Sequence, residues 1–435
     1  MTLALGRSMQ SRSMRNETTR GTLNQRKRLR RVQRVGLSVL LALGLPCSAC
    51  MLLHRVPGAA PAVADAARAV LGDEAVAALE DGLYAIEDGV KRRVYAGARP
   101  QAHWRVDPPR VPAKSDAAVA PAHAHANSEP TTAPPVFRPK DVGPLYLKQH
   151  AEGDGVWLAA EPEPTADTPV SFKTLIHPDP ERSYAELFVV ALDLERVRLH
   201  AVAGSAEPEN EAPGARAYSR EAAIPAPHRR ALLAAFNGGF KSTHGHFGMQ
   251  VDGVTLAPAK PGACTIAGYP EGELRIGTFA ELAEPARMSW YRQTPRCMVE
   301  AGVRHPALTN SRSWGATLDG KTVIRRSAVG LNTERSVLFV GISNSTTAEA
   351  LARGMQHAGA TTVAQLDVNY SFPRFLFYAH TDEGVNTIPV AEGFVYTEGQ
   401  YLKGRSERDF FYLTRTETAH VARPARHIAE LEARN

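Results

Sequence analysis

The alternation of apolar and polar positions divides this chain of 435 residues into segments of different character. Between residues 61 and 96, apolar residues recur every three or four positions, which predicts an amphipathic helix with a break near Gly72. Residues 98–140 hold nine prolines among many alanines and predict an extended linker. From residue 141 to 417, short apolar or alternating runs are separated by turn residues, which predicts a globular, β-rich domain.

Strands are predicted in this domain wherever an apolar run or an alternation extends over several residues. Asp252-Gly253 and Asp319-Gly320 each precede or separate such runs and predict tight hairpins. The predicted strands cover residues 186–192, 196–203, 247–251, 254–257, 274–279, 322–331, 336–342, 362–366, 393–396 and 409–413.

One segment predicts a strand, a helix and a second strand in succession. Ser336–Ile342 is apolar, Thr346–Glu349 has the sequence of a capping box, and Gly359 is suited to end the helix. Such a unit predicts a parallel pair of strands with a right-handed crossover. The second strand brings Asp367 to its carboxyl end, where ligands bind in such units. The predicted fold class is α+β: a mixed, largely antiparallel β-sheet core with flanking helices and one strand–helix–strand crossover unit.

The net charge of +6 is unevenly distributed along the chain. Residues 1–34 contain ten lysines or arginines and one acid, so the remaining 401 residues carry a net charge of −3. The basic character therefore belongs to the N-terminal tail. A nucleic-acid partner of the main domain is not expected.

Residues 35–54 follow this tail and begin with 19 uncharged, mostly apolar residues. A helix of that length spans about 30 Å of hydrocarbon, which predicts a transmembrane anchor with an exported domain behind it. A cleaved signal segment is the alternative, and the sequence around Cys50 faintly resembles a lipoprotein cleavage site. The expected organisation is a basic cytoplasmic tail (1–34), an anchor or signal segment (35–54), a helical and then Pro/Ala-rich linker (55–140), the globular domain (141–417) and a C-terminal tail (418–435).

Two cysteines, Cys264 and Cys297, lie in the part of the chain that is expected to be exported. An oxidising compartment permits a disulfide between them, and two free buried thiols are the alternative. The sequence contains no cysteine-rich zinc pattern.

The first candidate site is Asn237-Gly238-Gly239-Phe240, which follows an apolar run. Two adjacent glycines at a strand end permit positive φ angles or the close approach of a ligand to the main chain. The asparagine offers a donor and an acceptor. Nearby, His244 and His246 would point to the same side of an extended chain, which suits a substrate hydrogen bond, a structural role or, with a third ligand, a metal.

The second candidate site is formed by Asp367, Asn369, Tyr370 and Ser371 after the crossover unit. A carboxylate, an amide and two hydroxyls suit a hydroxyl-rich ligand, although Asp and Asn also form turns after strands. Arg325 and Arg326 lie on a predicted strand, so they face opposite sides. One arginine is expected to face the site and the other to be solvated.

These segments together resemble the phosphodiester glycosidase family over roughly residues 170–415. Asn237–Phe240 matches the family's Asn-Gly-Gly-Phe segment, and Arg326–Gly330 matches its Arg-x-Ala-x-Gly strand. Leu366–Ser371 matches its Leu-Asp-Gly-Gly-Gly-Ser segment, but Val, Asn and Tyr stand in place of the three glycines. These larger side chains would narrow or reshape the pocket.

The resemblance implies a hydrolase that acts on a sugar-1-phosphodiester or a related envelope glycan, and the N-terminal segments predict that it is exported and tethered to the membrane. No metal or other cofactor is expected. The implied partners are this carbohydrate or sugar-phosphate substrate and, through residues 35–54, the membrane. Asp367 would act as acid/base or orient the sugar, and Arg326 would counter the phosphate charge. The substrate-binding residues implied by this reading are Asn237, Gly238, Gly239, His244 and Asn369.

Two alternatives remain at this stage. The loss of the family's glycines favours a non-catalytic envelope glycan-binding or scaffold protein on the same fold. His244 and His246 leave room for a metal-dependent hydrolase.

Overall fold

The computed structural model describes residues 72–106, 137–160, 169–309, 322–369 and 371–416, all of which fall within one unit, residues 67–435. The predictions for the N-terminal tail, the segment 35–54, the hairpin at Asp319-Gly320 and the tail 418–435 lie outside the described residues. Among the helices that the described residues form, none combines the length and the apolar character needed to cross a membrane.

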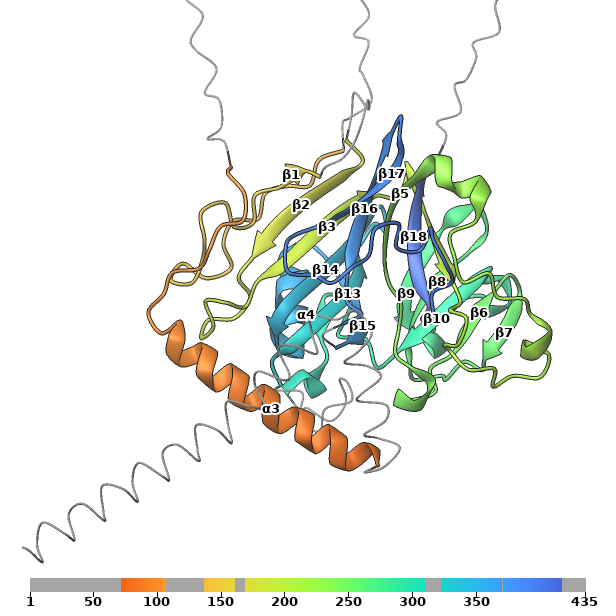
Figure 1. The fold of residues 1–435 in the computed structure, drawn as a ribbon, viewed down its shortest axis with the longest axis horizontal. Helices are drawn as coiled ribbons and strands as arrows, with labels where there is room; N and C mark the ends of the chain where they lie inside the picture. Colours follow the sequence, from red (N-terminus) through yellow and green to blue (C-terminus); the bar gives the residue numbers. More distant parts are fainter. Residues whose placement is uncertain (1–71, 107–136, 161–168, 310–321, 370, 417–435) are drawn as a thin grey trace, which may run out of the picture. The chain divides into compact units, whose positions relative to one another are not determined.

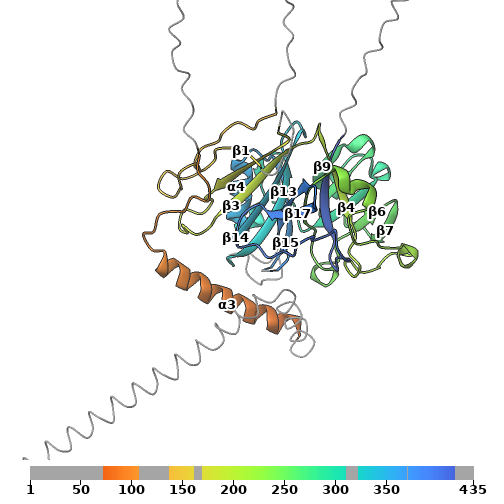
Figure 2. The ribbon, with the colours of Figure 1, turned by 45° about the horizontal axis from the view of Figure 1, so that its top comes forward.

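The described strands form three antiparallel sheets (Figures 1 and 2). In spatial order, sheet A consists of β1 (Leu158–Ala159), β2 (Ser171–Ile176), β3 (Leu187–Asp193), β14 (Val337–Thr346), β13 (Ile324–Leu331), β15 (Thr362–Val368), β11 (Val299–Glu300) and β12 (Val303–Arg304). Sheet B consists of β17 (Gly384–Pro389), β16 (Phe375–Thr381), β5 (Leu232–Asn237), β18 (Phe410–Arg415) and β4 (Val197–Val202). Sheet C consists of β7 (Val254–Ala257), β6 (Met249–Val251), β10 (Trp290–Thr294), β8 (Cys264–Gly268) and β9 (Leu274–Thr278).

Helices are fewer, so the predicted α+β class with a largely antiparallel core is confirmed. The two described α-helices are α3 (Asp73–Val94) and α4 (Ala348–His357). The short 3-10 helices are Ala215–Ala217, Ala226–Ala231, Ser242–His244, Pro270–Gly272, Phe279–Glu281, Pro285–Arg287 and Pro306–Thr309.

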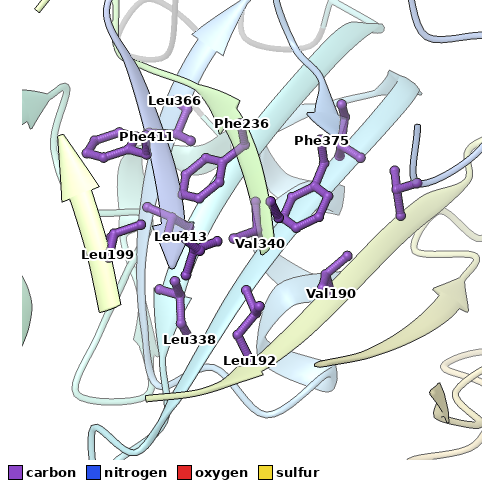
Figure 3. Close-up of a cluster of buried hydrophobic side chains, with 14 of the residues drawn as sticks. Val190, Leu192, Leu199, Phe236, Leu338, Val340, Leu366, Phe375, Phe411 and Leu413 are labelled. Atoms are coloured by element: carbon purple, nitrogen blue, oxygen red, sulfur yellow. The ribbon is translucent and has the colours of Figure 1, made fainter. Parts of the chain in front are cut away.

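The main hydrophobic core lies between sheets A and B and extends to two strands of sheet C. Phe236 of β5 and Phe375 of β16 stack with their ring centroids 6.0 Å apart, among aliphatic side chains of sheet A. Figure 3 shows side chains from both sheets turned toward one another: Val190, Leu192, Val340 and Leu366 of sheet A, with Leu199, Phe236, Phe375, Phe411 and Leu413 of sheet B. This core holds the ends of β5 and β15 together, and the candidate site residues lie at or directly after these ends.

Helix α4 covers the other face of sheet A. Val340 and Phe339 are neighbours on β14, yet the first belongs to the core between the sheets and the second packs with Leu351 and Met355 of α4. The predicted cap is confirmed, because the Thr347 hydroxyl accepts a hydrogen bond of 3.1 Å from the Ala350 N–H.

The strand–helix–strand unit is present, but its two strands are not neighbours. β14 and β15 both pair antiparallel with β13, so they run in the same direction with β13 between them. The two strands are therefore parallel, as expected, but they do not pair with each other. The physical reason is that β13 precedes the unit in the chain and its eight buried residues fill the centre of the sheet.

Most predicted strands are confirmed, including the hairpin at Asp252-Gly253, where Val251 pairs with Val254. Asp252 and Gly253 have φ angles of 51° and 75°, as a tight hairpin turn of this kind requires. The predicted strand at 393–396 is wrong, since this segment is irregular. The hairpin of β16 and β17 was not predicted.

Helix α3 confirms the helix expected within 61–96, and Gly72 directly precedes it. Asp88 joins α3 to the β-rich part of the chain, because its carboxylate accepts hydrogen bonds from Arg182 (2.9 Å) and Tyr184 (2.5 Å).

A disulfide joins Cys264 to Cys297, so the alternative of two free thiols does not hold.

Candidate functional site

The candidate site lies where sheets A and B meet. β5 of sheet B ends at Asn237, which pairs with Phe410, the first residue of β18. The backbone N–H of Asp367, near the end of β15 in sheet A, donates a hydrogen bond of 3.2 Å to the carbonyl of Gly238. The Asn-Gly-Gly segment, Asp367 and the start of β18 therefore come together, although they are far apart in the sequence.

A β-bulge next to Asp367 interrupts the pairing of β15. Arg326 and Ala328 of β13 pair with Val368 and Gln365, so two residue steps on β13 oppose three on β15. A bulge bends the strand and changes the direction of its side chains. This irregularity frees the Asp367 N–H from the pairing with β13 and lets it bind across to sheet B.

The Asp367 carboxylate is buried and accepts three hydrogen bonds. Its Oδ2 atom binds Arg408 Nη2 at 2.8 Å and Asn369 Nδ2 at 3.0 Å. Its Oδ1 atom binds the Val368 N–H at 2.9 Å. Asp367 is 3% exposed and Arg408 is 5% exposed, so this ion pair is held in a largely water-free environment.

Arg408 extends the pair toward the Asn-Gly-Gly segment. Its Nη2 also donates to the carbonyl of Gly239 (2.9 Å), and its Cζ lies 4.4 Å from the centroid of the Phe372 ring. Burial lowers the pKa of Arg408, but the carboxylates of Asp367, Asp409 and Glu207 outweigh burial and raise it above its ordinary value. No described residue accepts a hydrogen bond from the buried Nε of Arg408, so this cation keeps one unused donor.

Asn237 is a buried connector between the two sheets. Its Nδ2 donates to Ser327 Oγ at 2.9 Å, and its Oδ1 accepts the Arg374 N–H at 3.1 Å. The Ser327 hydroxyl in turn donates to the carbonyl of Asp367 at 3.3 Å. The donor and acceptor expected of Asn237 are thus both used within the protein, and they position Asp367.

Gly238 and Gly239 allow the close approach of two charged side chains. Neither glycine has a positive φ angle. A Cβ on Gly238 would lie 2.1 Å from Asp409 Oδ2, and a Cβ on Gly239 would lie 2.8 Å from Arg292 Cζ. The N–H of Gly238 donates to the Asp409 carbonyl (3.0 Å), and the N–H of Gly239 donates to Asp409 Oδ2 (2.8 Å). The absence of side chains on the two glycines therefore makes room for the internal Arg292–Asp409 ion pair. Their predicted contact with substrate stays a prediction.

Gly238→Ala is expected to lower the free energy of unfolding by about 1–3 kcal/mol, because overpacking displaces the Asp409 carboxylate. Chemical denaturation of both proteins measures this difference. Gly262→Ala is the matched control, since a Cβ there meets no atom within 4 Å and its φ is not positive. It should change the free energy by less than about 0.5–1 kcal/mol. Equal stability of the two variants would contradict the close contact.

Asn369 and Phe372 lie at the partly exposed rim of the site. Besides binding Asp367, Asn369 accepts the N–H groups of Ser371 (2.8 Å) and Phe372 (2.7 Å) through Oδ1. Asn369 therefore forms a turn and also touches the buried carboxylate. Its predicted contact with substrate stays a prediction.

Arg325 and Arg326 are both buried, so the expectation that one of them is solvated is wrong. Arg326 donates to the carbonyls of Thr346 (3.1 Å) and Thr322 (3.1 Å). Ser327, its neighbour on β13, contacts Asn237 instead, which places Arg326 on the opposite face of the strand. The structure does not bring Arg326 together with Asp367 through any described side-chain contact.

His244 and His246 are not on an extended segment. His244 ends a short 3-10 helix, Gly245 has φ 130°, and His246 has φ 45°. His246 Nδ1 lies 2.8 Å from Glu211 Oε1. Within the described part of the chain, no three His, Cys, Asp or Glu side chains are grouped as a metal site would need.

The structure adds four charged residues to the site that the sequence did not single out: Arg292, Glu207, Arg408 and Asp409. Arg408-Asp409 directly precedes β18, and Gly238-Gly239 directly follows β5. A charged pair next to a predicted strand could have been singled out from the sequence as a candidate for the site. Its contact with the Asn-Gly-Gly segment could not, because only the pairing register of β5 and β18 brings the end of β5 next to the start of β18.

Comparisons with known proteins yield distant structural similarities only. No protein family and no curated protein matches the sequence. The structure is similar to the catalytic domain of zebrafish N-acetylglucosamine-1-phosphodiester alpha-N-acetylglucosaminidase, with a TM-score of 0.37 and 14% identity over 59% of this chain and 87% of that one. A hypothetical protein from Synechocystis (TM-score 0.27, 10% identity, 58% and 65% covered) and a putative exported protein from Burkholderia pseudomallei (TM-score 0.29, 12% identity, 53% and 74% covered) are similar as well. These values indicate a distant likeness of fold.

Proposed function

We propose that this chain is an exported hydrolase, tethered to the membrane through residues 35–54, that cleaves a sugar-1-phosphodiester or a related envelope glycan. The observation that carries the proposal is the buried Asp367–Arg408 pair at the junction of two sheets, beside the Asn-Gly-Gly segment. The resemblance of the sequence motifs to phosphodiester glycosidases gives the substrate class.

The pair offers opposite charges for the two halves of such a substrate. An arginine recognises phosphate oxygens through several N–H groups, and the Nε of Arg408 has no partner among the described residues. Asp367 would orient the sugar or transfer a proton, as the sequence resemblance implies. A phosphate is a good leaving group, so we expect breaking of the sugar–oxygen bond to need little help from a strong acid.

Arg408, rather than Arg326, is our preferred partner for the phosphate. Arg408 touches Asp367 directly, whereas the described hydrogen bonds of Arg326 go to main-chain carbonyls on the opposite face of β13. Arg408→Lys is therefore expected to weaken turnover of the phosphodiester more than Arg326→Lys does, because lysine lacks the planar, multiple donors of arginine.

A non-catalytic glycan-binding protein is the second candidate function. One observation favours it: each oxygen of the Asp367 carboxylate is already held by internal donors. Val368 and Asn369 also stand where the family has glycines.

The test uses the purified full-length protein in detergent with a panel of sugar-1-phosphodiesters. Release of free sugar, followed by chromatography, is the result expected of a hydrolase, and it should fall more in Arg408→Lys than in Arg326→Lys. Binding of the same compounds by calorimetry without any release of sugar would support the glycan-binding alternative. If the protein neither binds these compounds nor releases sugar from them, both functions are refuted.

A further inference from the structure

Glu207 lies beside the Asp367–Arg408 pair, in the segment that follows β4. Its backbone N–H donates to the carbonyl of Glu407 at 2.9 Å, and Glu407 directly precedes Arg408. This contact fixes Glu207 next to the start of β18. The residue is partly exposed, whereas Asp367 and Arg408 are buried.

The two oxygens of the Glu207 carboxylate have different surroundings. Oε2 accepts a hydrogen bond of 2.8 Å from the Ser242 N–H, which belongs to the short helix that follows the Asn-Gly-Gly-Phe segment. None of the described residues donates a hydrogen bond to Oε1. One oxygen is therefore anchored to the site, and the other is open to water or a ligand.

The charged side chains that act on Glu207 come from three other segments of the chain. Arg408 and Asp409 precede β18, Arg292 comes from β10, and Arg220 donates to the carbonyl of Gly204 in the same turn. Burial raises the pKa of Glu207 above its ordinary value, and Asp409 adds to this rise. The Ser242 N–H, Arg408 and Arg292 lower the pKa but offset only part of it.

We propose that Glu207 is the carboxylate that exchanges a proton with water in the hydrolysis at the Asp367–Arg408 pair. The inference rests on the proposed function and names a second carboxylate for it. Glycoside hydrolysis generally uses two carboxyl groups with different roles, set by different environments. Here one carboxylate is held by an arginine and fixed donors, and the other is half-buried with an open oxygen.

The reaction balances without any further reactant. The oxygen of water bonds to C1 of the sugar, and the bond between C1 and the phosphate oxygen breaks with its electron pair going to the phosphate. The Glu207 carboxylate accepts one proton from the attacking water and returns it to the released phosphate or to solvent. Arg408 stabilises the negative charge on the leaving phosphate, and Asp367 orients the sugar.

The test compares Glu207→Gln with the wild-type full-length protein over a range of pH on a sugar-1-phosphodiester. Proton transfer by a positioned side chain contributes about 100-fold or more, so kcat should fall by at least that factor. Activity of the wild type should decline toward low pH as Glu207 becomes protonated, and this decline should be absent in the variant. Because glutamine still accepts the Ser242 N–H, the variant is expected to fold.

Two further variants separate proton transfer from a structural role. Formate added to Glu207→Ala should restore part of the activity, because a small carboxylate can occupy the vacated space and accept the proton. Glu209→Gln is the matched control, since this exposed carboxylate two residues away has no described hydrogen bond of its side chain. It should keep the wild-type kcat and pH profile.

The outcomes are distinguishable. If the wild type hydrolyses the phosphodiester and Glu207→Gln keeps its kcat and pH profile, the inference is overturned and the proposed function stands. A loss of activity in Glu207→Gln with an unchanged acidic decline, and without rescue by formate, would also overturn it in favour of a structural role. If the wild type hydrolyses no sugar-1-phosphodiester, the proposed function fails and the inference fails with it.

Discussion

Asp367→Asn is expected to lower kcat for a sugar-1-phosphodiester by about 100-fold or more, with little change in the fold. Asparagine has the size of aspartate but lacks its charge, and its amide group has two donors of its own. Arg408, which donates to Asp367 Oδ2 at 2.8 Å, would then face a neutral and partly repulsive neighbour. Steady-state kinetics over a range of substrate concentrations measure the effect on kcat and KM separately, and circular dichroism checks the fold.

Asp193→Asn is the matched control for this prediction. Asp193 is also a buried carboxylate of sheet A in an ion pair, with Arg196 Nε at 2.7 Å, but it ends β3 and has no described contact with the site. It should lose stability and keep its kcat. If Asp367→Asn keeps the wild-type kcat while Asp193→Asn behaves as expected, Asp367 has no part in turnover and the glycan-binding alternative gains.

The sequence was sufficient to predict those features of the fold that depend on interactions between residues close together in the chain. The Asp252-Gly253 hairpin follows from two residues that adopt positive φ angles, and the start of α4 follows from the hydroxyl of Thr347. The position of Asp367 near the end of a strand also followed from one apolar run. These features are determined by interactions between residues that are only a few positions apart in the sequence.

The pairing of strands that are far apart in the chain could not be predicted from the sequence. The insertion of β13 between β14 and β15 depends on which buried strands pair, and all three strands are buried along most of their length. The partner of Asp367 could not be foreseen for the same reason, because Arg408 is 41 residues away in the chain. The bulge on β15 that accompanies their contact left no residue-type signal either.

The double glycine illustrates how one signal can have two physical causes. Gly238 and Gly239 were expected to provide positive φ angles or room for a ligand, and both reasons are common for glycine at a strand end. In the structure the room is filled by Asp409 and Arg292. Neither glycine has a positive φ angle, and the atoms that approach them come from β10 and from the residue before β18.

Arg292→Met is expected to produce the largest loss of stability among the changes considered, about 3–5 kcal/mol in the free energy of unfolding. Arg292 is fully buried, and its Nε donates to Asp409 Oδ2 at 2.8 Å. Its Nη atoms donate to the carbonyls of Phe240 (2.6 Å) and Phe247 (3.0 Å). Methionine fills much of the space but leaves the Asp409 carboxylate buried without its cation. Denaturant titration followed by tryptophan fluorescence measures the loss.

The matched control is Arg287→Met, which removes an arginine from an exposed pair with Glu284 at 2.8 Å. Exposed ion pairs contribute less than about 1 kcal/mol, so this variant should unfold almost as the wild type does. The double variant Arg292→Met/Asp409→Asn should regain part of the lost stability, because it no longer buries an uncompensated charge. If Arg292→Met unfolds like Arg287→Met, the buried pair does not hold the Asn-Gly-Gly segment in place. The N–H group of Gly238 and that of Gly239 each donate to Asp409. If the Arg292–Asp409 pair does not fix Asp409, another interaction must hold this segment rigid.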